Sequence, residues 1–490
     1  MVKTKISLPF MILGIIFSSL GGHCLAEDIP FGINNPYDDS APKEKANMIR
    51  HYMNDLGIKK VNGNVFRKNV EPKPGVYNWN EPDFFVNDIF KDLDLIFVIN
   101  SRTNWPAEGS IKIGKNIYIP GGDINGESLK LYKEFLNKLI YRYKDRVHEW
   151  MIYNEPAQEY KSNPEDYVNL LKVSYMTIKT IDPQATVYLG GVMPSIISMK
   201  FLNKTLPLLS SKHPVLGNEN AKNNNYFDGF DFHYFDSYDK YRYIHAKRTI
   251  TSVDEYLNIF KKYGLLEKKI ITSRAGGTYT GEDLKTKHKG RPLTYQSEVQ
   301  QAGYLIRRAI YLLSKGVISF WSQIREREKW EGNPNDFFCY QGLVYNGVPK
   351  GDKYDKGDGV KKLSYWTYKF LVEKIKETNW KNVSVLHDGT GSDHLYLYKL
   401  IKKNGQPLYV AWWDYFDEKK PGKTKSITID VGNIESVKVT ETIPNAEWGA
   451  DLKEKEYPNF FKTEIKKVVD GKVSFDLKEK PVFVEAKGKT

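Results

Sequence analysis

The sequence is poor in cysteine. Only two of its 490 residues are cysteines, Cys24 and Cys339, and the first lies in an N-terminal segment that we expect to be removed. A single remaining cysteine excludes an intramolecular disulfide, so the fold must be stabilised by its core. With 40% hydrophobic residues, the chain has enough apolar side chains for one large domain and a smaller one. We expect Cys339 to be an ordinary packed thiol.

The sequence also lacks the motifs of common cofactor sites. No group of His, Asp and Glu residues has the spacing of a metal site, so we expect no metal and no cofactor. The segment "DINGE" at residues 123–127 is too short to indicate calcium. No glycine-rich phosphate turn follows the first predicted strand, which argues against an open doubly wound sheet.

Long apolar runs are scarce, and the one at the N-terminus has the layout of a secretory signal. Two lysines precede an apolar run from Ile6 to Leu20, and a small residue, Ala26, precedes the first acidic one. The run is short for a bilayer span and contains Pro9, which argues against a retained anchor. We therefore expect residues 1–26 to be a signal peptide and the protein to be secreted, to the periplasm or the exterior.

Acidic residues are fewer than basic ones, 60 against 73, which gives a formal net charge of +13. Loss of the two signal-peptide lysines leaves 13 − 2 = +11. A basic protein can bind nucleic acid, an acidic lipid surface or an anionic polysaccharide, and export argues against nucleic acid. Mixed-sign runs such as "KGDKYDKGDGVKK" are typical of a solvated surface. The expected partner is an oligosaccharide or polysaccharide, neutral or anionic, with no stable membrane span.

Apolar runs alternate with stretches of helical period from residue 29 to about 378, which indicates repeated βα units. The eight strand candidates are "PFGINN", "KKVNGNVF", "LDLIFVIN", "VHEWMIYN", "ATVYLGGV", "FDGFDFHY", "KKIITS" and "VISFWSQ". Long helices are predicted between them, and the one before the last strand is expected to stop at Gly316. Eight strands with eight helices predict an α/β fold, a (β/α)₈ TIM barrel over residues 27–379.

The final part of the chain has a different period. Runs such as "HLYLYKL", "LYVAWW", "SITIDV", "SVKVTE" and "VSFDL" alternate with period 2 and are separated by turns. They predict a small antiparallel β-sandwich over residues 380–490.

Functional groups of a TIM barrel gather at the C-terminal ends of its strands. The fourth predicted strand ends in "YNEPA", which places the acid Glu155 beside the amide of Asn154. The runs "TVYLGG", "FHY" and "FWSQ" follow in order, with "EPKPGVYNW" and "GLVYNGVPK" around them. Together these motifs resemble the retaining glycoside hydrolases of clan A, above all family 39 and its exopolysaccharide-hydrolysing relatives. The resemblance spans nearly the whole predicted barrel.

This resemblance implies a pair of carboxyl groups about 5 to 5.5 Å apart, a proton donor and a nucleophile. It assigns the acid/base role to Glu155, a hydrogen bond to the sugar 2-hydroxyl to Asn154, and a stacking platform to Trp321. Three further side chains either line the same cleft or pack in the core: Trp105, His233 and Tyr234.

The nucleophile is where this sequence departs from the family. The seventh strand should end in a pattern like T-x-E-A-G-G, but residues 272–277 read "TSRAGG". The nucleophile position falls on Arg274, or on Ser273 if the register shifts by one. A guanidinium stays protonated and cannot act as nucleophile or base. Beside Glu155 it would also favour the ionised carboxylate, whereas a general acid must hold its proton.

The family residues that support the nucleophile are replaced as well. Asn62 stands where the second strand carries an arginine, and Arg67 stands where a tryptophan follows it. Phe235 takes the place of a tyrosine at the end of the sixth strand. The loss of the nucleophile is consistent with the loss of the residues that support it. An arginine kept at position 62 would face Arg274, and the two positive charges would repel each other at close range.

Two hypotheses follow. In the first, the protein is a glycosidase in which Glu155 is the acid and Glu328 or Glu326, from "QIREREKWEGN", acts as a surrogate carboxylate. Such a charge run is otherwise typical of a solvated surface. In the second, the protein is a pseudo-glycosidase that binds a glycan without cutting it, and Arg274 pairs with a sugar carboxylate. A purely structural protein would leave the aromatic residues at the strand ends unexplained.

Overall fold

The computed structural model describes most of the chain after residue 28. The described ranges are 29–34, 46–193, 195–234, 253–274, 287–288, 291–292, 296–329, 333–334, 336–348, 356–390, 394–414 and 423–487. The predicted signal peptide lies outside them. Within these ranges, no helix is both long enough and apolar enough to cross a membrane.

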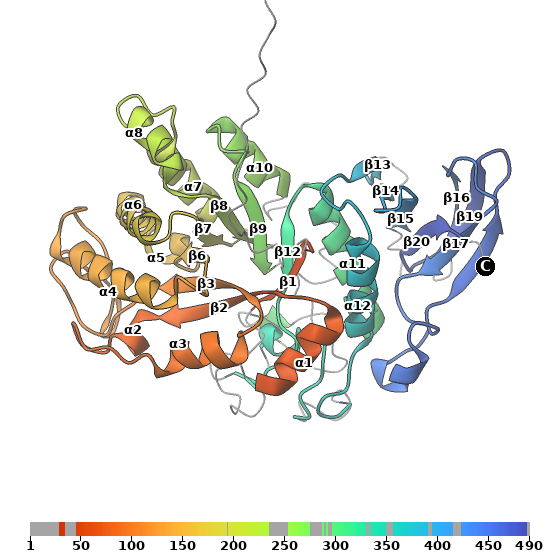
Figure 1. Cartoon of the computed structure of the whole chain (residues 1–490), viewed down its shortest axis with the longest axis horizontal. Coiled ribbons are helices and arrows are strands. Elements are labelled where there is room, and N and C mark those ends of the chain that lie inside the picture. The colour runs from red at the N-terminus through yellow and green to blue at the C-terminus, as the bar shows by residue number, and fades with distance from the viewer. Residues whose placement is uncertain are drawn as a thin grey trace, which may run out of the picture.

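Eight parallel strands close into a barrel (Figure 1), which confirms the predicted fold class. Around the barrel the order is β1, β12, β9, β8, β7, β6, β3 and β2. Their bounds are Phe31–Asn34 (β1), Lys60–Phe66 (β2), Asp94–Asn100 (β3), Glu149–Ile152 (β6), Thr186–Val192 (β7), Gly229–His233 (β8), Lys269–Arg274 (β9) and Ile318–Trp321 (β12). Each of the eight predicted apolar runs forms one of these strands.

The outer layer consists of amphipathic helices that bury one face against the strands. The longer ones are α1 (Ala46–Leu56), α4 (Glu127–Tyr143), α6 (Pro164–Ile181), α7 (Ile196–Leu209), α10 (Val253–Lys262), α11 (Glu298–Ser314) and α12 (Leu363–Lys376). A capping box of Ser297 and Gln300 starts α11. Gly316, at φ +71°, ends it, as predicted.

Shorter elements occupy the connections. Helical turns are α2 (Arg67–Val70), α3 (Asn80–Phe84), η2 (Phe85–Ile89), α5 (Pro156–Glu159), α8 (Gly217–Lys222), η3 (Asn224–Tyr226) and η4 (Phe337–Tyr340). Two small hairpins are β4 (Ile111–Gly114) with β5 (Ile117–Ile119), and β10 (Lys287–His288) with β11 (Arg291–Pro292). The first hairpin lies between β3 and α4, so it belongs to the C-terminal mouth of the barrel.

The inside of the barrel is a packed core with a cluster of charged residues at its base, here called the charged floor: Glu149, Lys60 and Lys269. Ile96, Val98, Met151, Tyr188, Ile271 and Phe320 form the apolar layer. Near the start of β6, Glu149 bonds to Lys60 Nζ at 2.7 Å and Lys269 Nζ at 2.9 Å, and Tyr188 donates its hydroxyl hydrogen to the same carboxylate. Burial acts to raise the pKa of Glu149, but the two ammonium groups outweigh it and hold the pKa at about 2.

The C-terminal region is an antiparallel β-sandwich, as predicted. One sheet has the order β13 (Ser384–Asp388), β14 (Leu395–Ile401), β15 (Pro407–Trp413), β20 (Val482–Ala486), β17 (Ser436–Glu441) and β18 (Thr463–Lys467). The other pairs β16 (Lys425–Asp430) with β19 (Lys472–Leu477), and η5 (Gly449–Asp451) and η6 (Glu454–Glu456) lie in the loop after β17. Side chains such as Ile427, Val439 and Phe475 fill the space between the two sheets.

The outer face of the large sheet packs on the barrel helices, which joins the two regions into one core. Phe483 of β20 lies 5.5 Å from Phe370 of α12, measured between ring centroids. The buried Glu298 of α11 accepts hydrogen bonds from the backbone N–H of Leu363 at 2.6 Å and of Gly449 at 2.9 Å. This one carboxylate therefore binds α11 to the start of α12 and to the C-terminal region.

Candidate active site

Glu155 lies at the C-terminal mouth of the barrel, directly after β6. Two residues of this turn have left-handed backbone, Tyr153 at φ +69° and Glu155 at φ +55°. Non-glycine residues rarely adopt this conformation, and it is frequent at functional sites. Pro156 then opens α5, and the Glu155 N–H donates to the carbonyl of Gly191 at 2.9 Å. The turn thus presents the carboxyl group of Glu155, 19% exposed, toward the mouth.

The carboxyl group of Glu155 contacts His233, the last residue of β8. Its Nδ1 lies 2.9 Å from Glu155 Oε1, and its Nε2 lies 3.7 Å from Asp231 Oδ2. His233 and Asp231 have no exposed side-chain surface. The three groups form a line from the solvent-facing acid to a buried carboxylate. The two ring nitrogens of His233 thus each face a carboxylate, Nδ1 that of Glu155 and Nε2 that of Asp231.

Glycine on β7 makes room for this line. A Cβ on Gly191 would lie 2.2 Å from Asp231 Oδ2 and 2.6 Å from His233 Nε2. A Cβ on Gly190 would lie 2.1 Å from the carbonyl oxygen of Tyr153. The "LGG" of the fifth predicted strand therefore has a physical reason, because any side chain there would displace the acid or the residues behind it.

A second cluster lies beside Glu155. Arg102, two residues after β3, donates from Nε to the hydroxyl of Tyr153 at 3.1 Å, and its Nη2 forms an ion pair with Glu159 Oε1. Glu159 closes α5, one helical turn after Glu155. Burial raises the pKa of Glu159, and the Glu155 charge adds to this increase against the opposing effect of Arg102. Glu155 and Glu159 are thus electrostatically coupled carboxyl groups.

Arg274 is the last residue of β9, and its Cα pairs with that of His233. An extra residue in β9 produces this register, because Asp231 pairs with Ile271 while His233, two residues on, pairs with Arg274. The backbone of Arg274 is therefore at the level of the histidine that contacts Glu155. The side chains of Ser273 and Arg274, and the whole of Phe235, lie outside the described part of the chain.

The two surrogate carboxylates proposed from the sequence differ in their surroundings. Glu326, 5% exposed, forms an ion pair with the fully buried Lys362 at 2.5 Å. Glu328 is exposed two residues later. Glu326 is thus committed to a structural ion pair, and the surrogate role of Glu328 stays a prediction.

The predicted ligand-binding side chains are not all at one surface. Trp321 ends β12, but it is only 4% exposed and its indole N–H donates to the carbonyl of Gln341 at 3.0 Å. Tyr234 packs under Arg308 of α11, whose guanidinium carbon lies 3.7 Å from the ring centroid. This contact places Tyr234 against the helix layer, whereas the neighbouring His233 contacts Glu155. The half-buried Asn154 precedes Glu155 at the mouth.

Trp105 is half-buried in the loop after β3, near Arg67. The Arg67 guanidinium lies 5.0 Å from the Trp105 ring centroid and pairs with Glu71 at 2.7 Å. Trp105 itself donates its indole N–H to the carbonyl of Glu71 at 3.0 Å. Asn62 is buried within β2, in register with Asn34 of β1. Arg67, which the resemblance predicts to stand in place of a tryptophan, thus has a packing role in this structure.

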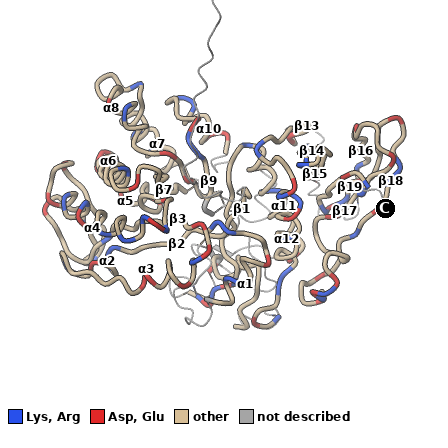
Figure 2. Tube along the Cα trace, in the orientation of Figure 1, with Lys and Arg blue, Asp and Glu red and all other residues tan. Residues whose placement is uncertain are grey.

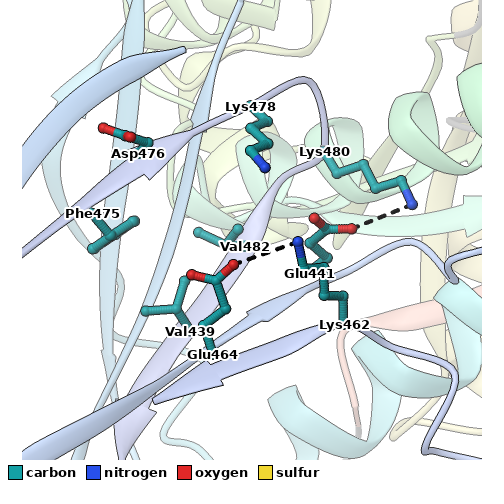
Figure 3. Close-up of a pocket in the computed structure, with 9 residues that line it drawn as sticks. All are labelled: Val439, Glu441, Lys462, Glu464, Phe475, Asp476, Lys478, Lys480 and Val482. Atoms are coloured by element: carbon teal, nitrogen blue, oxygen red, sulfur yellow. Dashed lines mark ion pairs between the residues drawn. The ribbon is translucent and has the colours of Figure 1, made fainter. Parts of the chain in front are cut away.

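Another polar hollow lies in the C-terminal sandwich and shares no residue with the mouth (Figure 3). Its wall carries three lysines and three acids, and two of the lysines are paired: Lys462 with Glu464 at 3.5 Å and Lys480 with Glu441 at 3.3 Å. Basic and acidic residues are likewise interspersed along the coloured part of the trace (Figure 2). The balanced charge of the hollow gives no preference for an anion. Among the described residues, no group of three His, Cys, Asp or Glu side chains is placed to hold a metal ion.

No family model and no curated protein sequence matches the chain. Solved structures do. A family 39 glycoside hydrolase from the gut symbiont Bacteroides cellulosilyticus WH2 has a TM-score of 0.58 at 16% identity, over 94% of this chain and 82% of that one. A monomeric β-xylosidase from Caulobacter crescentus CB15 has a TM-score of 0.53 at 13% identity, over 94% and 96%. A 4-O-α-L-rhamnosyl-β-D-glucuronidase from Fusarium oxysporum 12S has a TM-score of 0.52 at 12% identity, over 93% and 95%.

Proposed function

We propose that this protein, whose chain has the fold of the clan A glycoside hydrolases, is a secreted protein that acts on the O-glycosidic bonds of an oligosaccharide or polysaccharide. Glu155 is its general acid/base, and Arg274 occupies the position of the nucleophile. The observation that carries the proposal is the carboxyl group of Glu155 at the barrel mouth, 2.9 Å from a buried histidine that is backed by Asp231.

In the proposed reaction, Glu155 in its protonated form donates a proton to the leaving glycosidic oxygen. The fully buried ring of His233 restricts where the carboxyl group can lie, because its Nδ1 is 2.9 Å from Glu155 Oε1. Water is the attacking group, because an arginine at position 274 cannot form a covalent bond to the sugar. Glu328 is the candidate base for that water.

A second candidate function is glycan binding without hydrolysis. The observation that favours it is the ion pair of Glu326 with Lys362, which removes one of the two surrogate carboxylates from the reaction. A pair of carboxyl groups about 5 to 10 Å apart is needed for either stereochemical course of hydrolysis. In this case Glu155 and Asn154 bind sugar hydroxyl groups, and Arg274 pairs with a sugar carboxylate.

An anionic ligand is part of the proposal. The mature chain is basic, and its fold is also that of a β-D-glucuronidase. A guanidinium binds a carboxylate through two parallel hydrogen bonds, which is stronger and more selective than a single bond. We expect a uronic-acid oligosaccharide to bind more tightly than its neutral counterpart, by about 1.5 to 3 kcal/mol that Arg274→Ala removes.

The test uses the mature protein, Glu155→Gln and a control, Glu435→Gln, in an exposed residue of the C-terminal sandwich. Calorimetry with paired acidic and neutral oligosaccharides measures binding, and release of reducing ends measures hydrolysis. We expect wild type and control to bind alike, and Glu155→Gln to lose any hydrolysis. If the wild type binds a glycan but does not hydrolyse it, the second function is supported. If it binds neither acidic nor neutral glycans, both candidate functions are refuted.

Secretion has its own test. Expression of the whole chain with its N-terminus intact should yield an exported protein whose first residue is Glu27, as read by N-terminal sequencing. Retention of the full-length chain inside the cell would contradict this part of the proposal alone.

A further inference from the structure

The turn that carries Glu155 is bridged by one arginine. Arg102 Nε donates to the hydroxyl of Tyr153 at 3.1 Å, and Arg102 Nη2 pairs with Glu159. Tyr153 precedes Glu155 by two residues and Glu159 follows it by four. Arg102 therefore holds both flanks of the acid from a different strand connection, the loop after β3.

Arg102 contacts a turn whose backbone conformation is unfavourable. Tyr153 and Glu155 are both left-handed, and such residues persist only where the surroundings fix them. The backbone N–H groups are already used: Tyr153 donates to the carbonyl of Ile99 at 3.0 Å and Glu155 to that of Gly191 at 2.9 Å. Arg102 adds the side-chain contact, because the Tyr153 ring is fully buried and offers its hydroxyl to the guanidinium.

Arg102 and Glu159 also determine the charge next to the carboxyl group of Glu155. Arg102 is 36% exposed and Glu159 is 13% exposed, so the carboxylate is the more buried partner of the pair. Glu159 is close enough to Glu155 to feel its charge. The ionisable groups around Glu155 include His233 and Asp231 from β8, Glu159 from α5 and Arg102 from the loop after β3. On β9, the backbone of Arg274 reaches the same level.

We propose that Arg102 is a positioning residue for Glu155: it fixes the turn from Tyr153 to Glu155 and, by neutralising Glu159, controls the charge next to the acid. The importance of this control rests on the proposed function, in which Glu155 exchanges a proton. The bridge itself is a property of the protein without ligand. Its test therefore needs no glycan.

Four variants separate the two effects. Arg102→Met removes the bridge and its charge, Arg102→Lys keeps the charge but reaches only one partner, and Glu159→Gln keeps the size but removes the negative charge. Arg142→Met is the control, since Arg142 pairs with Asp83 at 2.5 Å on the outer face of α4 and is 42% exposed. Melting temperatures identify any variant that fails to fold.

Two measurements are made on each variant. Carbon-13 NMR follows the carboxyl titration of Glu155, whose signal is identified by its loss in Glu155→Gln. Amide hydrogen exchange follows the peptide that spans residues 153–160. We expect the Glu155 midpoint to move to higher pH in Arg102→Met, and to lower pH in Glu159→Gln. Arg102→Lys should keep the wild-type midpoint but exchange faster in this peptide, as Arg102→Met does.

If Arg102 and Glu159 act through their charges, the Glu155 midpoint shifts in opposite directions in Arg102→Met and Glu159→Gln. If the substitutions only loosen the turn, both midpoints move toward the value of the unfolded chain. Shifts in the same direction, or none, would overturn the charge part of the inference. Unchanged exchange in Arg102→Met would overturn the positioning part. An absence of glycan binding by wild type would refute the proposed function while leaving these results intact.

Discussion

The charged floor of the barrel makes Glu149→Gln an informative perturbation. In wild type, Glu149 receives Lys60 Nζ at 2.7 Å, Lys269 Nζ at 2.9 Å and the Tyr188 hydroxyl. Glutamine keeps the size but removes the negative charge. It leaves Lys60, whose side chain is 4% exposed, buried without its counter-ion. Loss of one partner of a buried ion pair is costly because the remaining charge stays desolvated.

The magnitude follows from the pKa of Glu149, which the fold holds at about 2 against an ordinary 4.5. Each pKa unit is equivalent to about 1.4 kcal/mol, so the ionised carboxylate contributes about 3 kcal/mol to stability near neutral pH. Because the folded pKa is depressed, this contribution is fully present above pH 4.5 and is lost as the pH falls toward 2. The side chain is 18% exposed, so solvent screening makes this an upper value.

Urea unfolding of wild type and Glu149→Gln at pH 7, 5 and 3 measures the effect. The surface pair of Asp83 with Arg142 provides the control, Asp83→Asn, which should cost less than about 1 kcal/mol. We expect a difference of about 3 kcal/mol between wild type and Glu149→Gln at pH 7, falling at pH 3. A difference that is the same at all three pH values would refute the assignment of this stability to the ionised carboxylate.

Two more predictions concern packing around the site. Gly191→Ala should lower the melting temperature and abolish glycan binding, since its Cβ would lie 2.2 Å from Asp231 Oδ2 and 2.6 Å from His233 Nε2; unchanged binding would contradict the tight fit. Lys362→Met should cost about 3 to 5 kcal/mol by leaving buried Glu326 without its cation. The double variant with Glu326→Gln should recover part of this loss, and a fully additive double-mutant cycle would contradict the pairing.

The barrel was predictable because its strands are buried on both faces and appear in the sequence as short runs rich in apolar residues. Three sandwich strands were missed, each for a different reason. The side chains of β13 are all exposed, and β18, "TEIKK", is a charged edge strand. The third, β20, lies between β15 and β17 in the large sheet, so its first four residues are all buried and show no alternation.

For the candidate site, the sequence yields Glu155 and Asn154 through the "NEP" motif. The sequence also names His233, as a residue that either lines the cleft or packs in the core, and its contact with Glu155 depends on barrel closure. Asp231 precedes His233 by two residues on the same strand and therefore shares its face, a signal that period-2 alternation contains. The Arg102–Glu159 pair gives no such signal, because it joins the loop after β3 to a turn that follows a different strand.

The Glu298 carboxylate has a consequence for the order in which the chain can fold. Its backbone donors Leu363 and Gly449 are 86 residues apart, and both are synthesised after α11. Arg307, on the same helix, donates to the carbonyl of Glu479 at 2.6 Å, later still. Domains usually fold as they emerge, N-terminal part first. Here α11 cannot satisfy these contacts until residues 363, 449 and 479 have all been made, so the barrel and the sandwich should unfold in a single cooperative transition.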